Sequence, residues 1–251
     1  MKPYDTIEDK KSQIKTMFDN IAPTYDRLNH LLSLNIDRVW RRRAVKAVAA
    51  CGPSSVLDIA TGTGDMALSL ARRLKQVHIT GVDLSECMLA EGRVKVVRAG
   101  MDGRILMEQG DAEHLHFADG SFDALMSAFG VRNFGDLAAG LSEMHRVLRS
   151  GGRAVILELS NPPKGVLRWM YDLYSHRMLP RIGGAVSHDA KAYEYLPASV
   201  DEFPVAEEFC EMLRAAGFVR VQARRQSFGI AHIFIAEKGT EGDKAIKCKE
   251  I

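Results

Sequence analysis

The sequence has few cysteines and no long hydrophobic run, and each scarcity excludes a class of protein. Its four cysteines are scattered, without a Cys-x-x-Cys pair or the dense spacing of a disulfide framework, and they are expected to be free thiols in a reducing compartment. No run of about eighteen apolar residues predicts a transmembrane helix, and the first residues lack the apolar core of a signal peptide. These absences predict a soluble cytoplasmic protein.

A strong excess of charge and a clear metal-ligand cluster are also missing. Lys and Arg total 34 against 32 Asp and Glu, so the formal net charge of +2 is far from the basic excess typical of nucleic-acid-binding proteins. His114 and His116 have no third ligand near them, so no metal site is predicted. The main basic run, 41–43, is either a solvated helix face or a contact with an anionic membrane surface.

The apolar pattern divides the chain into a helical preface, an alternating α/β region and an insert. Residues 10–50 have helical spacing, and residues 55–159 alternate strands with helices in the manner of a doubly wound parallel sheet. Residues 161–201 break the alternation, as a lid or substrate cover does. We expect one domain over 1–238, followed by a disordered polar tail over 239–251.

The expected elements follow from apolar runs and their bounding turn residues. The predicted strands are 55–60, 77–83, 104–109, 122–128 and 152–159, and the predicted helices are 65–74, 86–98, 136–149 and 205–215. Two further runs, 218–221 and 232–236, are close enough in the chain to pair as an antiparallel hairpin. The sheet is therefore expected to end in that hairpin.

The most informative motif is an apolar strand that runs into two closely spaced glycines. Residues 56–59 suit a buried strand, and Gly62 and Gly64 allow a tight backbone turn beside a ligand. Nineteen residues past Gly64, a second apolar run ends at Asp83, whose carboxylate can accept hydrogen bonds from a ribose. Together these features predict a nucleotide pocket.

Three further acids indicate which nucleotide this is. The glycine pair also satisfies the loose dinucleotide fingerprint, so an NAD-dependent oxidoreductase is the competing interpretation. Asp58 can order the loop or hold a ligand ammonium, and Asp65 would repel a phosphate and suit a cation. Asp111, beside the small Ala112, can hold an adenine edge. These acids favour a positively charged, phosphate-free nucleoside.

These motifs resemble those of a known enzyme superfamily. Residues 58–64 are similar to motif I of the class I S-adenosylmethionine-dependent methyltransferases, and Asp83 and 111–112 match later landmarks. Two longer stretches, 25–40 and 146–160, resemble the signatures of the ubiquinone/menaquinone biosynthesis C-methyltransferases, the demethylmenaquinone methyltransferase family. The likeness runs from about residue 14 to residue 238. It departs from the family at Asp37, Ala128, Ser150 and Leu159.

The resemblance implies a fold, a cofactor and its binding residues. The fold is α/β, a Rossmann-like seven-stranded, mostly parallel sheet with a terminal antiparallel hairpin. The cofactor is S-adenosylmethionine, converted to S-adenosylhomocysteine, and no metal is required. The residues implied to bind it are Asp58, Thr61, Gly62, Thr63, Gly64, Asp83, Leu84, Met88, Asp111, Ala112 and Ala128. Met88 has a second interpretation, since a methionine at helical spacing is often core.

The resemblance also implies a substrate and catalytic residues. The methyl group goes to a ring carbon of a prenylated quinol, most simply demethylmenaquinol, with the ubiquinone step as a further option. Arg132, Asn133 and Tyr25 are the implied catalytic residues. Arg132 would stabilise a phenolate, and its other interpretation is a pair with a structural carboxylate. His188, Asp189 and Tyr195 are weaker substrate-side candidates.

Partners and alternatives stay open at this point. A prenyl tail predicts an apolar channel, for which the insert offers Leu167, Trp169, Met170, Leu173, Met178 and Leu179, although a helix-on-sheet core explains them equally well. Peripheral membrane association at the inner membrane face and a homodimer are options, and nucleic acid is not an expected partner. The competing functions are a methyltransferase for a sterol, lipid or other small molecule, the NAD-dependent oxidoreductase, and a non-catalytic S-adenosylmethionine-binding module.

Overall fold

A computed structural model describes residues 2–4, 6–163, 165–174 and 190–240 of the chain. Several sequence predictions fall outside these ranges, including His188, Asp189, Met178, Leu179 and most of the predicted tail. Among the described residues, no helix has the length and hydropathy that crossing a membrane requires.

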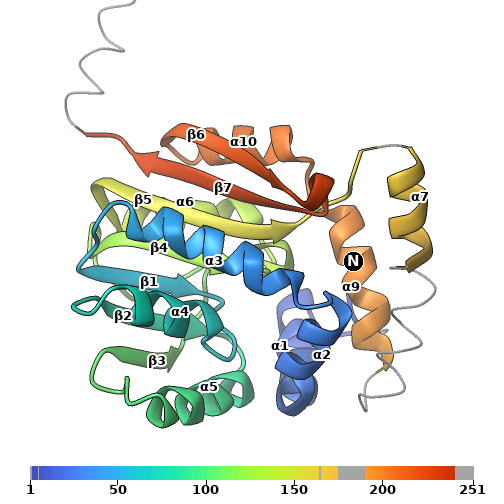
Figure 1. The fold of residues 1–251 in the computed structure, drawn as a ribbon, viewed down its shortest axis with the longest axis horizontal. Helices are drawn as coiled ribbons and strands as arrows, with labels where there is room; N and C mark the ends of the chain where they lie inside the picture. The colour runs from blue at the N-terminus through green and yellow to red at the C-terminus, as the bar shows by residue number, and fades with distance from the viewer. Residues whose placement is uncertain (1, 5, 164, 175–189, 241–251) are drawn as a thin grey trace, which may run out of the picture.

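The centre of the molecule is a seven-stranded sheet in the order β3-β2-β1-β4-β5-β7-β6 (Figure 1). The strands are β1 Ser55–Ile59, β2 His78–Asp83, β3 Ile105–Gln109, β4 Phe122–Ala128, β5 Leu148–Leu159, β6 Phe218–Gln226 and β7 Ala231–Lys238. Strands β1 to β5 pair in parallel, whereas β7 pairs antiparallel with both β5 and β6. The predicted α/β fold, with a mostly parallel sheet and a terminal hairpin, is confirmed.

Helices cover both faces of the sheet. One core joins the strands to α3 Ile36–Ala49, α4 Asp65–Arg73 and α5 Glu86–Arg98, and the other joins them to α6 Leu137–Val147 and α10 Ala206–Ala215. This arrangement follows from the near-continuous apolar strands, because a parallel sheet buries both of its faces. The observed boundaries differ from prediction in β5, which begins four residues before the predicted 152–159, within the predicted helix 136–149. They differ also in the hairpin, where β6 and β7 extend beyond the predicted 218–221 and 232–236. Strand β6 is an edge strand rich in exposed polar residues, so the apolar pattern understates its length.

The helical preface consists of α1 Lys10–Ile21, a 3₁₀ turn Ala22–Thr24, α2 Tyr25–Leu32 and α3. The insert contains α7 Val166–Leu173 and α9 Ala190–Glu202. A third apolar cluster joins the two segments, with Ile14, Met17 and Leu28 packed against Ala192 and Tyr195. Figure 1 shows α1, α2, α7 and α9 gathered at one end of the sheet, where the arrowhead of β5 points. Preface and insert, far apart in the sequence, therefore form one cap.

Asp58 lies near the end of β1 and is buried, with 1% of its surface exposed. The Thr61 hydroxyl donates a hydrogen bond of 2.7 Å to Oδ2. Oδ1 has no hydrogen-bond partner among the described residues. Burial raises the pKa of Asp58 to about 7, because the charged form loses its hydration and neither the hydrogen bond from Thr61 nor the attraction of Arg41 offsets that loss. The charged carboxylate therefore lowers the free energy of unfolding.

We expect Asp58→Asn to remove part of the pH dependence of stability. The folded-state pKa of Asp58 lies above its unfolded value. The contribution of this carboxyl to the free energy of unfolding is therefore fully present below about pH 4 and is lost as pH rises through about 7. Urea unfolding at pH 5 and pH 8 should show wild type losing on the order of 3 kcal/mol more than the variant. The exposed Asp102→Asn serves as the control. Equal pH dependence in wild type and Asp58→Asn would contradict this assignment.

Candidate functional site

The site begins where the chain reverses direction across the sheet. From β1 the chain proceeds outward to β2 and β3, and then returns to place β4 on the other side of β1. Connections therefore leave β1 and β4 in opposite directions, and a crevice opens at their carboxyl ends. Ala60 and Phe129, at these two ends, have left-handed backbone conformations with φ of 53° and 64°. A Cβ on Gly130 would lie 2.4 Å from the Cβ of Ala60, so only glycine allows this approach.

Asp83 holds together the loops that follow β1 and β2. Its Oδ2 accepts a hydrogen bond of 2.8 Å from the Gly62 amide, and its Oδ1 accepts one of 2.9 Å from the Ser85 amide. Gly62 and Gly64 both have positive φ, at 56° and 79°, as the predicted tight turn requires. Burial raises the pKa of Asp83 to about 6, even though the two amides favour the charged form.

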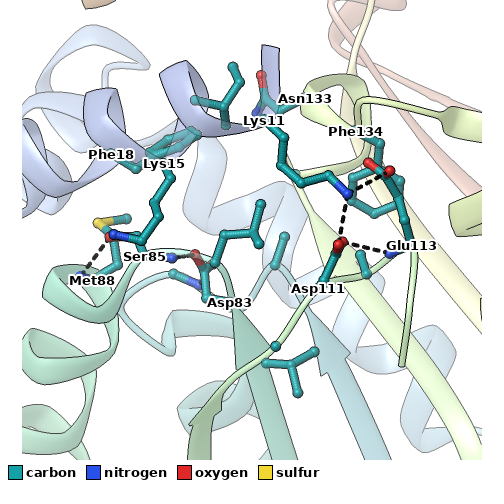
Figure 2. A pocket seen from close by; sticks show the side chains of 18 of the residues that line it. Lys11, Lys15, Phe18, Asp83, Ser85, Met88, Asp111, Glu113, Asn133 and Phe134 are labelled. Carbon is teal, nitrogen blue, oxygen red and sulfur yellow. Dashed lines mark hydrogen bonds and ion pairs between the residues drawn. The ribbon is translucent and has the colours of Figure 1, made fainter. Parts of the chain in front are cut away.

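A first cavity, with about 680 Å³ of empty space, lies over these loops (Figure 2). It draws on the ends of β1, β2, β3 and β4, as ligand sites of open parallel sheets do. The predicted site residues that line it are Tyr25, Gly62, Asp83, Leu84, Met88, Asp111, Ala112, Ala128 and Asn133. The other predicted cofactor residues, Asp58, Thr61, Thr63 and Gly64, lie in the glycine loop and are not among the lining residues.

The loop residues outside the lining have partners within the protein. Thr63 donates a hydrogen bond of 2.6 Å to Asp26 on α2. The Lys95 ammonium lies 2.6 Å from Asp26 and 2.5 Å from Asp65. The cation that Asp65 was expected to suit is thus supplied by α5, not by a ligand. This cluster ties the preface to the glycine loop.

Sequence reasoning missed the contribution of α1 to the first cavity. Lys11, Ile14, Lys15 and Phe18 all line it, because α1 crosses above the strand ends (Figure 2). Helical spacing shows that α1 is a helix but carries no signal of which distant loop it covers. Ser85 was also missed, although its position three residues before Met88 is an N-cap signal, confirmed by a hydrogen bond from the Met88 amide.

Ion pairs join α1 to the loops below it. The Lys11 ammonium lies 2.7 Å from Asp111 and 2.8 Å from Glu113. Burial tends to raise the pKa of Asp111, but the interactions with Lys11 and the hydrogen bond from the Glu113 amide together hold the pKa below its ordinary value. Lys15 lies 2.7 Å from Asp19 on its own helix. Both lysines of the described lining are therefore already neutralised by carboxylates.

The chemistry of this lining fits S-adenosylmethionine better than a dinucleotide. Asp83, Asp111 and Glu113 offer carboxylate acceptors, whereas a pyrophosphate needs free cations or an open helix N-terminus. Met88 and Phe134 offer apolar surface for a base. A sulfonium and an ammonium are attracted by a lining in which carboxylates outnumber lysines.

A second, larger cavity adjoins the first and has about 1090 Å³ of empty space. Its walls come from α1, α2, α3, α7 and α9, so preface and insert enclose it together. Most of the lining is apolar or aromatic, as in Met17, Ile21, Leu32, Trp40, Leu159, Tyr171, Tyr174, Tyr195, Leu196, Val200 and Ile230. Both cavities are lined by Phe18, Tyr25, Phe129 and Asn133, which form a common wall.

The insert residues that were expected to line an apolar channel, and whose side chains the structure describes, do not line the second cavity. Trp169 and Leu173 are exposed on α7 and are not among the lining residues. Tyr195, a weaker candidate in the sequence, does line the second cavity. The remaining channel candidates have side chains outside the described part of the structure.

Arg132 lies on the wall of the second cavity and is paired with a buried carboxylate. Its Nη1 is 2.8 Å from Oε1 of Glu158, which is 0% exposed, and its Nε donates to Ser199 at 3.2 Å. Desolvation lowers the pKa of Arg132, but the attraction of Glu158, Tyr25 and Tyr195 together raises it above its ordinary value, so the guanidinium stays charged. Among the described residues, Nη2 has no hydrogen-bond acceptor. Arg132 thus has a structural partner and a nitrogen left for a ligand.

Asn133 has an unpartnered polar atom at the common wall. It is 7% exposed, and its Oδ1 finds no donor among the described residues. A buried carbonyl oxygen without a donor costs stability, so such an atom in a cavity wall indicates a place for a ligand donor.

The tyrosines of the second cavity are held neutral. Desolvation raises the pKa of Tyr25, and it raises those of Tyr171 and Tyr195 to about 12. These phenols are therefore hydrogen-bond donors near neutral pH and not bases.

Two curated relatives match the chain over nearly its whole length. The demethylmenaquinone methyltransferase of Bacteroides fragilis is 44% identical over 238 residues, which are 95% of this chain and 97% of the relative. The ubiquinone/menaquinone biosynthesis C-methyltransferase UbiE of Geobacter sulfurreducens is 50% identical over 234 residues, which are 93% of this chain and 91% of the relative.

The fold is shared with solved methyltransferase structures. A SAM-dependent methyltransferase from Thermotoga maritima superposes with a TM-score of 0.63 at 20% identity, covering 90% of this chain and 99% of that one. Identity this low shows the fold alone. A model of the ubiE/COQ5 methyltransferase family matches residues 6–238, which confirms the resemblance stated for 25–40 and 146–160. With relatives this similar along its length, the chain belongs to the ubiE/COQ5 methyltransferase family.

Proposed function

We propose that this protein transfers a methyl group from S-adenosylmethionine to a ring carbon of a prenylated quinol, with demethylmenaquinol as the substrate. The observation that carries the proposal is the pair of cavities, one with three carboxylates in its lining and one lined mostly by apolar and aromatic residues, with a common wall. A polar, cationic methyl donor and an apolar acceptor need different surroundings that meet at one point. The names of the two relatives supply the quinol class.

The first cavity is proposed to hold the cofactor. Asp83 would accept hydrogen bonds from the ribose, and Asp111 with Ala112 would hold the adenine edge. Met88 and Phe134 would pack against the base. Bound S-adenosylmethionine supplies an electrophilic methyl group on a positively charged sulfur. The glycine loop residues Asp58, Thr61, Thr63 and Gly64 would act by shaping the turn beside its amino-acid portion.

The second cavity is proposed to hold the quinol and to raise the electron density of its ring. The Arg132 guanidinium would stabilise the phenolate that forms when a quinol hydroxyl loses its proton. Asn133 and Tyr25, on the common wall, would position the ring, through the free Oδ1 and a neutral phenol respectively. Since the tyrosines are not bases, the hydroxyl proton would leave to water. After methyl transfer releases S-adenosylhomocysteine, the methylated carbon would lose its hydrogen as a proton and the oxygen would be protonated again, which restores the quinol. A prenyl tail on the substrate would bring the enzyme to a membrane surface.

Incubation with methyl-labelled S-adenosylmethionine and demethylmenaquinol tests this function. We expect the label on the ring carbon and one S-adenosylhomocysteine per methyl transferred. Label on a quinol oxygen would contradict C-methylation, and cofactor binding without transfer to any reduced prenylated quinone would leave only a binding module.

Replacing Asp83 should weaken cofactor binding more than it weakens folding. Asp83→Ala removes a carboxylate at the cavity wall, and we expect a rise in the Kd for S-adenosylmethionine of about tenfold or more, because hydrogen bonds to charged groups contribute about 1.5–3 kcal/mol. Calorimetric titration measures the Kd, and urea unfolding verifies that the variant is folded. Asp102→Ala is the matched exposed control, and an unchanged Kd in Asp83→Ala would refute the role.

Replacing Arg132 should slow transfer while leaving cofactor affinity unchanged. Arg132→Lys retains a charge beside Glu158, which avoids an unpaired buried carboxylate, but removes the forked donor. We expect kcat to fall about 10²-fold, as when one donor to a developing oxyanion is lost, with the Kd for S-adenosylmethionine within about twofold of wild type. A weakened cofactor affinity with normal kcat would reverse the assignment.

A further inference from the structure

The turn between α2 and α3 presents leucines to solvent at an energetic cost. Leu34 is 75% exposed and has φ of 51°, a left-handed conformation that leucine rarely adopts. The following residue, Asn35, shares this conformation with φ of 61°. Leu31, one helical turn before, is exposed as well. A strained turn that displays a large apolar side chain indicates a surface built for contact.

This apolar surface continues along the first turn of α3. Ile36 and Val39 are both exposed and lie three residues apart, on neighbouring positions of one helix face. Trp169 and Leu173 are exposed on α7, whose following residue Tyr174 hydrogen-bonds to the Leu32 carbonyl. Of the twelve large hydrophobic residues exposed in the described structure, five lie on α2, α3 and α7, and a sixth, Leu34, lies in the turn between α2 and α3.

The exposed charged residues of α2, α3 and the turn between them are all basic, whereas α7 carries the ion pair of Arg168 with Asp172. The exposed charged residues from 27 to 46 are Arg27, Arg38, Arg42, Arg43 and Lys46. The only acid in this stretch, Asp37, is buried. Within the described structure, neither Arg38 nor Arg42 forms an ion pair. Apolar residues between unpaired arginines suit an anionic membrane surface, where each arginine is attracted to headgroups.

The basic run 41–43 is therefore divided between two environments. Arg41 turns inward, where it lies near Asp37 at 3.5 Å and over the Phe129 ring at 4.9 Å. Arg43 is exposed but donates to Gln226 at 2.7 Å. Arg42 is the member of the run without a protein partner in the described structure, and it shares a helix face with Arg38.

The exposed residues neighbour lining residues of the second cavity in the chain. Leu32, Ser33 and Trp40 line the second cavity, and they alternate in the chain with Leu31, Leu34 and Val39. A bilayer in contact with these exposed residues would lie directly at the cavity wall. A prenyl tail is itself a bilayer component, so its head group would have only a short path from the membrane to the ring site.

We infer that Leu31, Leu34, Ile36 and Val39, with Arg38 and Arg42, form a docking surface for an anionic lipid bilayer, with Leu34 inserted among the acyl chains. The inference rests on the proposed function, because a prenylated substrate would reside in the bilayer that this surface contacts. The protein contributes the apolar residues to the interface and the arginines to the phosphate layer.

Sedimentation with lipid vesicles tests the docking surface. The full chain is mixed with vesicles of phosphatidylcholine alone or with about one third phosphatidylglycerol, and the bound fraction is measured. The variants are Leu34→Asn and the double variant Arg38→Gln/Arg42→Gln. Asparagine tolerates the left-handed conformation, so the turn is retained. The matched controls are Leu106→Asn, at a leucine 58% exposed on β3, and Arg72→Gln/Arg73→Gln, at exposed arginines of α4.

Wild type and both controls should bind the anionic vesicles and bind those of phosphatidylcholine more weakly. Leu34→Asn should bind about tenfold more weakly, from lost apolar burial. The arginine variant should bind about 25-fold more weakly, with most of that difference removed at 0.5 M salt, which screens charges over about 4–5 Å. Vesicle binding of either variant equal to that of wild type would overturn the inference.

Two further measurements separate the possible failures. Sedimentation equilibrium without lipid reports the oligomeric state, and a dimer dissociated by Leu34→Asn would assign the surface to a second copy of the chain instead. Turnover of a water-soluble quinol with a short tail should be the same in wild type and Leu34→Asn. Absence of that turnover in wild type, with lipid binding intact, would refute the proposed function and not the docking surface.

Discussion

The site depends on the divergence of the chain at the carboxyl ends of β1 and β4. Parallel strands end in backbone groups that face the same way, and the opposite crossovers leave a crevice between them. Gly130 approaches Ala60 closely, so the two loops that follow β1 and β4 are in contact at the crevice. Asp83 fixes the neighbouring loops, and the preface and insert then divide the space into two cavities. Neither cavity would exist without this junction.

The sequence predicts the parts of the site that depend on local pattern. Gly62 and Gly64 are recognisable because a turn beside a buried strand needs positive φ, and Asp83 is recognisable because it ends the next strand. The parallel sheet and its terminal hairpin follow from the same alternation. The loop acids illustrate the limit of such reasoning. Asp65 has the predicted charge and position, but its cation is Lys95, which only the packing of α5 brings near.

What the sequence does not predict is contact between distant segments. Helical spacing identifies α1, but nothing in it shows that Lys11 reaches Asp111. Likewise Arg132 could be proposed from its place after β4, whereas its partner Glu158 is known only from the pairing of β4 with β5. The common wall of Phe18, Tyr25, Phe129 and Asn133 comes from three separate segments. Such arrangements are set by the total packing of the cap and not by any single motif.

Helix α1 contributes lining residues to both cavities. Lys11, Ile14 and Lys15 line the first cavity, Met17 and Ile21 line the second, and Phe18 lines both. A tilt of this one helix changes the two volumes together. If a ligand in one cavity fixes the position of α1, the ligand of the other cavity binds without the entropic cost of ordering that helix. By linkage, each ligand then raises the affinity of the other by the same factor. The methyl donor and its acceptor are then cooperative ligands of a single helix.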